Sequence, residues 1–188
     1  MTETDLITGL QRREEPAFRL LVEQYGDRVY NTALGLVHRP EDAEDIAQEV
    51  FIKVWEGIAA FKREAQLGTW IYRIAVTQAL DFRRKQQRQK RGGLLVSLFS
   101  RHEDEPEPPD FHHPGVAAEQ KENSALLFRA IRALPENQQA AFVLQKLEGL
   151  SQDEIAAVLE TTVSSVESLL HRAKQNLRKV LGGFDRLR

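Results

Sequence analysis

The sequence predicts an all-α protein in which an N-terminal bundle of about four helices and a C-terminal helix-turn-helix domain are joined by an acidic, proline-rich linker. Apolar residues recur at three- and four-residue spacings along most of the 188 residues, and no segment alternates as a strand would. Between the helical regions, residues 101–110 contain three prolines and five acids, a composition that prevents a regular element. We therefore expect domains at residues 1–92 and 124–188, and a linker at 93–123.

Apolar spacing predicts the helices of the N-terminal domain. One helix is expected over residues 18–25, where Gly26 interrupts it, and another over 29–37 with a different apolar face. Residues 43–58 carry one continuous apolar face, which predicts a helix of about four turns. The next helix runs into the six basic residues of the segment 83–91.

The C-terminal domain carries clear signals for helix boundaries. Pro135 in a first turn predicts a helix start, and Gly149 predicts a stop. The segment Ser151–Glu154 has the spacing of a capping box, which opens the next helix. After a short break, which contains Glu160 instead of the usual glycine, the apolar residues of Val166–Leu177 predict the last helix.

The composition excludes several classes of protein. The chain has no cysteine, which excludes disulfide scaffolds, thiol nucleophiles and cysteine-ligated metal sites. No stretch approaches the roughly 18 apolar residues of a membrane span, and Met1–Pro16 lacks the apolar core of a secretory signal. We therefore expect a cytoplasmic protein with no direct membrane insertion. The formal charge is +1 for residues 1–92, −5 for 93–123 and +2 for 124–188, so only local basic patches could attract a polyanion.

The segment 151–178 is the most informative part of the chain. Ile155, Leu159, Val166 and Leu169 are placed as the crossing helices of a helix-turn-helix require, with a small alanine between them. Polar residues of the second helix fall outside these positions, and such a face can enter a major groove. The alternative is a helical hairpin with a solvated face. The candidate DNA-binding residues are Ser164, Ser165, Glu167, Ser168, His171, Arg172 and Lys174.

A second candidate site combines aromatic and basic residues. Rings can stack on unpaired bases while cationic groups pair with phosphates, so the combination suits single-stranded nucleic acid. The alternative is that the aromatic residues pack in the core and the basic residues complement a helix dipole. The candidates are Trp70, Tyr72, Arg73 and residues 81–85, with Lys62 and Arg63 in the preceding loop.

A third candidate is an acidic stripe opposite the apolar face of residues 43–58. Asp42, Asp45 and Glu49 share one side of the predicted helix, together with Gln48. This stripe could meet a basic protein surface. The alternative is that acids near a helix N-terminus only complement its dipole.

No catalytic site is indicated. His102, Asp110, His112 and His113 of the linker could ligate a metal ion, but they lack the spacing of a defined site. The sequence has no phosphate-binding glycine loop, no Gly-x-Ser-x-Gly motif and no set of acid, base and nucleophile. We therefore expect no catalytic residues, no metal and no cofactor, and a protein that acts by binding.

Five motifs in order give the chain a family resemblance that covers nearly its whole length. They are Asp42–Phe51, Thr69–Ala75, Leu134–Pro135, Leu150–Ala156 and Val166–Lys174. The chain resembles the extracytoplasmic-function (ECF, group 4) sigma factors of bacterial RNA polymerase. The resemblance implies a promoter-specificity subunit that binds core RNA polymerase, recognises −35 and −10 elements and nucleates promoter melting. Residues 1–92 would bind the −10 element and the β′ clamp helices, and residues 124–188 the −35 element and the β flap. An anti-sigma factor is implied as a further partner.

The resemblance also implies roles for individual residues. The residues implied to bind core polymerase are Asp42, Asp45, Gln48, Glu49 and Phe51. Those implied to read and open the −10 element, as double- and single-stranded DNA, are Lys62, Arg63, Trp70, Tyr72, Arg73, Thr77, Asp81 and Arg84. The −35 element would be read by the polar face already described. Thr77 replaces the family's usual asparagine, and Glu167 and Leu169 replace the lysine and arginine of many members, so the −35 motif cannot be taken from a relative.

Three other functions fit parts of the sequence. A stand-alone helix-turn-helix regulator would bind a palindrome as a symmetric dimer, although residues 1–92 show no ligand-pocket or receiver signature. A metal-dependent hydrolase would use the linker histidines. A helical adaptor would have no role in nucleic-acid binding.

Overall fold

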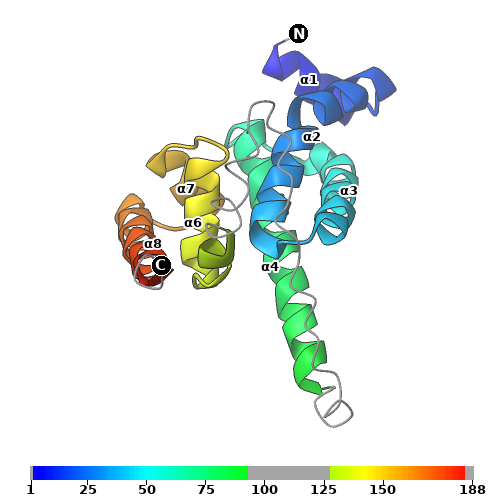
Figure 1. The fold of residues 1–188 in the computed structure, drawn as a ribbon. Helices are drawn as coiled ribbons and strands as arrows, with labels where there is room; N and C mark the ends of the chain where they lie inside the picture. The colour runs from blue at the N-terminus through cyan, green and yellow to red at the C-terminus, as the bar shows by residue number, and fades with distance from the viewer. Residues whose placement is uncertain (1, 93–127, 185–188) are drawn as a thin grey trace, which may run out of the picture.

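The computed structural model describes residues 2–92 and 128–184, and within these ranges it consists of helices and short connections without a strand. The prediction of an all-α fold is confirmed, whereas the expected linker at 93–123 lies outside the described residues. The N-terminal elements are α1 (Glu3–Gln11), α2 (Glu15–Val37), α3 (Pro40–Gly57), the 3-10 turn η1 (Ile58–Ala60) and α4 (Leu67–Gly92). The C-terminal elements are a helical stretch at 128–132, α6 (Glu136–Lys146), α7 (Gln152–Val158) and α8 (Val163–Phe184). Figure 1 shows their arrangement.

Sequence reasoning missed helix α1. Its start is a capping box, in which the Asp5 amide donates to the Thr2 hydroxyl (3.2 Å) and the Thr2 amide donates to the Asp5 carboxylate (2.9 Å). Leu6, Ile7 and Leu10 are buried against the rest of the bundle. Only these few side chains carry the apolar face, so tertiary packing stabilises a helix too short to persist alone.

Helix α2 is continuous, so the expected interruption at Gly26 is wrong. An interior glycine costs a helix only about 1 kcal/mol relative to alanine. Leu21 and Val29, which flank Gly26, are both fully buried, and their packing outweighs that cost. The helix ends at Val37. The capping residue that follows, His38, has a left-handed φ of 63°, and its amide donates to the Leu34 carbonyl (2.9 Å).

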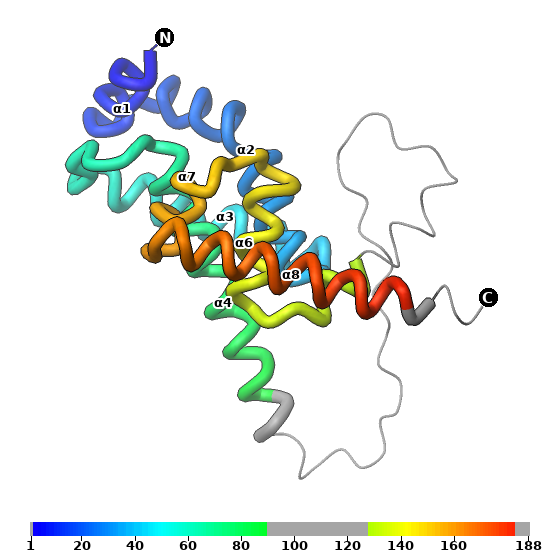
Figure 2. The backbone as a smooth tube through the Cα atoms, turned by 90° about the vertical axis from the view of Figure 1, so that its left-hand side faces the viewer, coloured from blue at the N-terminus to red at the C-terminus, as the bar shows by residue number. Residues whose placement is uncertain are grey.

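Helices α2, α3 and α4 pack on one another around an apolar core, and α1 and η1 cover one end of this bundle. The largest fully buried apolar side chains of the bundle include Leu21, Leu34, Ile58, Leu67 and Ile71. The C-terminal half of α4 extends beyond the other helices, as Figures 1 and 2 both show.

The helix boundaries of the C-terminal domain follow the sequence signals. Helix α6 begins directly after Pro135. Gly149 has a φ of 70° in the turn that follows α6, and the Ser151–Glu154 capping box opens α7. Glu160 replaces glycine in the turn between α7 and α8 and takes a left-handed φ of 53°. The turn therefore has the left-handed backbone conformation that glycine adopts without strain, and here Glu160 adopts it.

The two domains pack against each other. Helix α6 contacts α2, and α7 contacts α4. One cluster of buried apolar side chains therefore extends through both domains. The domains approach closely at Gly35 of α2, where an added Cβ would lie 3.0 Å from both methyl groups of Val143 and 3.1 Å from Leu147. The glycine therefore lets α6 lie directly on the backbone of α2.

His38 is buried where the two domains meet. The side-chain nitrogen of Gln139, on α6, donates to the Gly35 carbonyl (2.8 Å) and also lies against His38 Nε2, while Arg83 donates to the Gln139 oxygen. Since an amide nitrogen is only a donor, His38 accepts at Nε2 and its ring is neutral. Burial first, and then the charges of Arg83 and Arg132, lower the pKa of His38 to about 3.

Acid is expected to destabilise the folded protein through His38. Its pKa falls from 6.5 to about 3 on folding, so the unfolded state binds the additional proton. The contribution of His38 is complete above pH 6.5 and decreases as the pH falls toward 3, by about 1.4 kcal/mol per pH unit. His38→Asn retains a polar side chain that tolerates the left-handed backbone. In urea unfolding between about pH 6 and pH 4, this variant should lose less stability than the wild type.

The control for this prediction is His171→Asn, which replaces an exposed histidine on α8 and should keep the wild-type pH dependence. If the free energy of unfolding falls equally with pH in His38→Asn and in the wild type, the assignment of the acid sensitivity to His38 is wrong.

Among the helices in the described ranges, none combines the length and the apolar character needed to cross a membrane.

Candidate nucleic-acid interface

Helix α8 presents the polar face predicted for DNA binding. Val166, Leu170, Ala173 and Leu177 are buried on the opposite side of the helix. The Thr162 hydroxyl, just before the helix, accepts from the Ser165 amide (3.2 Å) and fixes the start of α8. All seven predicted side chains are exposed, namely Ser164, Ser165, Glu167, Ser168, His171, Arg172 and Lys174.

Helices α7 and α8 form the predicted helix-turn-helix. Ile155 and Val158 of α7 are buried and share a core with Val166 and Leu170 of α8. Leu159 caps α7, and its amide donates to the Ile155 carbonyl (2.8 Å), so the turn begins immediately. This packing determines which residues of α8 remain on its outer face.

An aromatic hollow lies at the start of α4. Trp70 stacks on Phe61 with a centroid distance of 4.9 Å and an interplanar angle of 28°, and its ring lies 3.2 Å from where a Cβ on Gly57 would be. Both rings are partly exposed and border a hollow of about 260 Å³, which is also lined by Lys62 and Glu64. A half-exposed ring beside a lysine is the arrangement that holds an unpaired base and its phosphate. Arg63 is exposed in the same loop, and its guanidinium donates to the Thr8 hydroxyl (3.1 Å).

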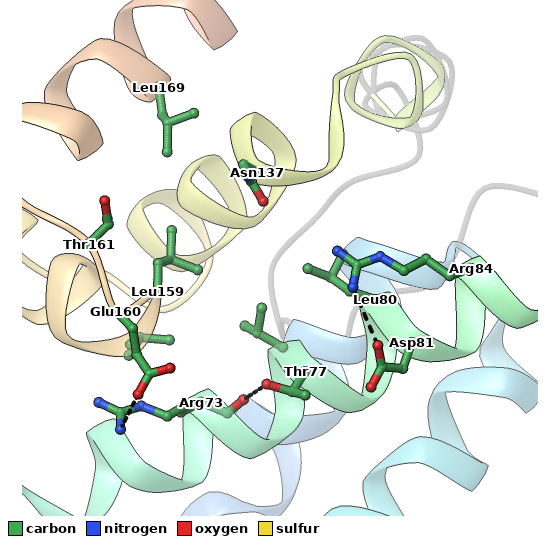
Figure 3. A pocket seen from close by; sticks show the side chains of 12 residues that line it. Arg73, Thr77, Leu80, Asp81, Arg84, Asn137, Leu159, Glu160, Thr161 and Leu169 are labelled. Atoms are coloured by element: carbon green, nitrogen blue, oxygen red, sulfur yellow. Dashed lines mark hydrogen bonds and ion pairs between the residues drawn. The ribbon is translucent and has the colours of Figure 1, made fainter.

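The remaining predicted residues of α4 face the second domain. Arg73, Thr77, Asp81 and Arg84 line a cleft of about 370 Å³ whose opposite wall comes from α6, α7, the turn after α7 and Leu169 of α8 (Figure 3). The Thr77 hydroxyl donates to the Arg73 carbonyl (2.8 Å), and Arg84 pairs with Asp81 (3.4 Å). One helix face therefore holds four of the residues predicted to read DNA, and it borders the second domain while Thr77, Asp81 and Arg84 remain exposed.

Tyr72 differs from its neighbours because it is buried, with 2% of its surface exposed. Its hydroxyl donates to the Glu148 carboxylate (2.8 Å), and the Arg28 guanidinium donates to the same oxygen (3.2 Å). Burial raises the pKa of Glu148, opposed by its hydrogen bond from Tyr72 and by Arg28. Burial also raises the pKa of Tyr72, so the hydroxyl stays protonated and acts as a donor. In this structure Tyr72 belongs to the contact between the domains.

The acidic stripe of α3 is partly assembled as predicted. Asp45, Gln48 and Glu49 are exposed, and Glu49 pairs with Lys53 one turn away (3.3 Å). Asp42 is only 17% exposed at its side chain and accepts from Gln86 of α4 (3.3 Å).

Two neighbouring apolar residues of α3 have different environments. Phe51 is buried in the core, as the apolar face of residues 43–58 predicts, and its assignment to polymerase binding stays a prediction. Ile52 is 51% exposed, one turn beyond Gln48 and Glu49, and continues the stripe with an apolar side chain. Sequence reasoning missed Ile52, although its place at i+7 from Asp45 is a signal that could have found it.

The residues considered for a metal site, His102, Asp110, His112 and His113, lie outside the described part of the chain. Within residues 2–92 and 128–184, no three histidine or carboxylate side chains are grouped as metal ligands.

A helix-turn-helix with an exposed polar face, packed on a helical bundle with an aromatic hollow, defines a two-domain helical DNA-binding protein. The family model "Sigma-70 region 2" matches residues 21–89, and "Sigma-70, region 4" matches residues 124–177. The RNA polymerase sigma-H factor of Pseudomonas aeruginosa is 30% identical over 95% of this chain and 93% of its own length. The ECF RNA polymerase sigma-E factor of Haemophilus influenzae is 31% identical over 93% of both. The chain belongs to the sigma-70 family of RNA polymerase sigma factors, in its ECF group.

A solved structure shares the fold. The sigma factor RpoE of Bartonella quintana, in complex with the anti-sigma factor NepR, superposes with a TM-score of 0.69. The two sequences are 19% identical, and the match covers 88% of this chain and 96% of that chain.

Proposed function

We propose that this protein is a promoter-specificity subunit, which binds core RNA polymerase, recognises −35 and −10 promoter elements and nucleates melting of the DNA. Membership of the ECF sigma factors supports this function over that of a stand-alone regulator. The observation that carries most weight is the presence, on separate domains, of two exposed surfaces with different chemistry. The outer face of α8 suits a duplex groove, and the hollow beside Trp70 suits an unpaired base.

Each surface has a separate role in this mechanism. The polar face of α8 reads the −35 element from the major groove, where Arg172 and Lys174 supply the positive charge. The Trp70 hollow captures a −10 base after it leaves the stack, so stacking and phosphate pairing offset the cost of unstacking. The exposed face of α3, with Asp45, Glu49 and Ile52, binds the β′ clamp helices.

Two further contacts are proposed from the family alone. The C-terminal domain contacts the β flap of the polymerase. An anti-sigma factor holds the protein inactive, which is supported by the complex of the structurally similar RpoE with the anti-sigma factor NepR.

Run-off transcription tests the proposed function. Purified protein is added to sigma-free core polymerase from the same organism with sheared genomic DNA, and the RNA 5′ ends are sequenced. New start sites that share two spaced upstream motifs are the expected result. No new starts, from core polymerase that another sigma factor activates, would overturn the proposal and favour a stand-alone regulator.

Arg172→Ala is expected to weaken binding to the −35 duplex by about ten-fold, because one guanidinium contact to a base edge contributes about 1–3 kcal/mol. Lys174→Ala should instead weaken binding to all sequences and lower the salt dependence by about one counterion. Fluorescence anisotropy with the motif found by transcription measures both effects. Arg178→Ala, at an exposed arginine farther along α8, is the matched control and should retain sequence preference. An equal loss of affinity for the −35 duplex in Arg172→Ala and Arg178→Ala would show that Arg172 does not recognise a base.

A further inference from the structure

Helix α1 packs along the chain segment that forms the aromatic hollow. This segment, residues 55–70, runs from the end of α3 through η1 to the first turn of α4. Helix α1 contacts η1, and its buried side chains share a core with Ile58 and Leu67 of the segment. Apolar burial is not directional, so it brings α1 to the segment without determining the conformation of the loop.

Two side chains of the N-terminal region hold the first part of the segment. The Arg13 guanidinium lies over the Trp55 ring, 5.0 Å from its centroid, and donates to the carbonyls of Trp55 and of the residue after it. The side-chain nitrogen of Gln11 donates to the carbonyls of Ile58 (3.3 Å) and Phe61 (3.4 Å). Carbonyl groups at helix ends lack partners within the helix, so both side chains fix the backbone where α3 and η1 end.

Two further side chains, both on α1, hold the rest of the segment. The Thr8 hydroxyl accepts from the Arg63 guanidinium (3.1 Å) in the loop after η1. Arg63 has a left-handed φ of 61°, which a residue other than glycine keeps only where its surroundings hold it. The Glu3 carboxylate accepts from the amide of Leu67, the first residue of α4 (3.2 Å). Trp70 follows within one turn, so this contact fixes the start of the helix that carries its ring.

These contacts follow a single order along the chain. From Arg13 back through Gln11 and Thr8 to Glu3, the partner positions advance from residue 55 to residue 67. The N-terminal region therefore runs antiparallel to the segment and contacts it at successive points. A single hydrogen bond would hold one point of the loop, whereas this series holds both of its ends and the residues between them.

The walls of the hollow depend on the part of the chain that is held in this way. The stack of Trp70 on Phe61 (4.9 Å) joins α4 to the end of η1, so it requires both to be in place. Lys62 and Glu64, which also line the hollow, lie between the contacts of Gln11 and Glu3. A site that is ordered before its ligand arrives loses less conformational freedom on binding and therefore binds more tightly.

We propose that α1 positions the aromatic hollow for an unpaired −10 base, with Gln11 and Thr8 as positioning residues. Gln11 acts on the backbone of η1 and Phe61, and Thr8 acts on Arg63. This inference rests on the proposed function, because it takes the hollow as the site of a −10 base.

The test uses exchanges that change no charge, so the general attraction of the protein for DNA is retained. Thr8→Val with Gln11→Met removes the polar groups that contact the segment and retains side-chain size. Thr4→Val with Gln24→Met makes the same two exchanges at exposed positions and is the matched control. Thr8→Ser retains the hydroxyl and should behave as the wild type.

Two measurements follow the hollow directly. In a Trp55→Phe background Trp70 is the only tryptophan of the chain, and acrylamide quenching of its fluorescence in the free protein should increase in the Thr8→Val, Gln11→Met variant. Holoenzyme assembled from this variant and core polymerase should bind a single-stranded −10 oligonucleotide, of the sequence found by run-off transcription, about ten-fold more weakly. Affinity of the free protein for the −35 duplex should not change, because α8 is untouched.

Greater quenching of Trp70 without a loss of −10 affinity would overturn the proposal, since the held conformation would then not matter for binding. Unchanged quenching would also overturn it, because α1 would not hold the ring. So would an equal loss of −10 affinity in the Thr4→Val, Gln24→Met control, which would indicate a general loss of stability.

If the double variant fails to fold, Thr8→Val compared with Thr8→Ser decides by the same two measurements. Failure of the proposed function is distinguishable from failure of this inference. It would appear in the wild-type protein, as an absence of new start sites with core polymerase, whatever the quenching of Trp70 in the variants.

Discussion

Asp45→Lys combined with Glu49→Lys is expected to weaken binding to core RNA polymerase by about 10²-fold, which corresponds to about 3 kcal/mol. Both side chains are exposed on α3, and Ile52 continues their row as an exposed apolar residue. The two lysines would repel a basic partner surface. The charged residues beside the apolar Ile52 would then no longer complement the charge of the partner. Affinity is measured by titrating core polymerase into labelled protein, and helical content by circular dichroism.

A matched control exists on α2. Glu23 and Asp27 are exposed acids four residues apart, so Glu23→Lys with Asp27→Lys makes the same change of charge on another face. This pair should retain affinity at the same ionic strength. Equal loss in both double variants would indicate a general electrostatic effect, and unchanged affinity in the α3 variant would leave its acids with only their role at the helix N-terminus.

Trp70→Ala is expected to reduce open-complex formation by about ten-fold or more while closed complexes form normally. The base-stacking surface beside Phe61 would be lost, and each stacked base contributes about 1–3 kcal/mol. The closed complex depends instead on duplex contacts. A permanganate footprint of unpaired thymines measures opening, and a gel-shift assay at low temperature measures the closed complex.

Two variants control for loss of stability. Trp70→Phe retains a ring against Phe61 and should recover most of the opening. Trp55→Ala removes the other tryptophan, which packs edge-to-face on Phe18 (4.9 Å) away from the hollow. If Trp55→Ala impairs opening as strongly as Trp70→Ala, or if Trp70→Ala reduces closed and open complexes equally, the role of Trp70 in base capture is wrong.

Local chemistry explains why many helix boundaries could be predicted. The Ser151–Glu154 capping box and Pro135 act within one turn of chain, so their effect is readable from sequence. Gly26 misled the prediction because its local cost is small beside the burial of Leu21 and Val29, which long-range packing decides. Helix α1 was missed for the same reason, since its stability comes from burial of a few side chains under the bundle.

In the candidate site, too, local sequence patterns predict some features and long-range packing decides others. The outer face of α8 was predictable because helical periodicity alone separates Val166 and Leu170 from the polar side chains between them. Helical periodicity also places Phe51 on the apolar face of residues 43–58 and leaves the adjacent Ile52 off that face, and the structure has Phe51 buried and Ile52 exposed. Tyr72 could be assigned to an aromatic and basic site from sequence, but its hydrogen bond to Glu148 joins residues 76 positions apart.

The sequence by itself determined the all-α class, the capping of α7, the polar face of α8 and the family, because each depends on local spacing or on ordered motifs. Only the tertiary structure decided that α6 and α7 lie against α2 and α4. It also decided that Arg73 and Arg84 pair with acids of the other domain. These contacts depend on the packing of whole helices around Gly35, and no local pattern specifies which distant residue fills the space beside a glycine.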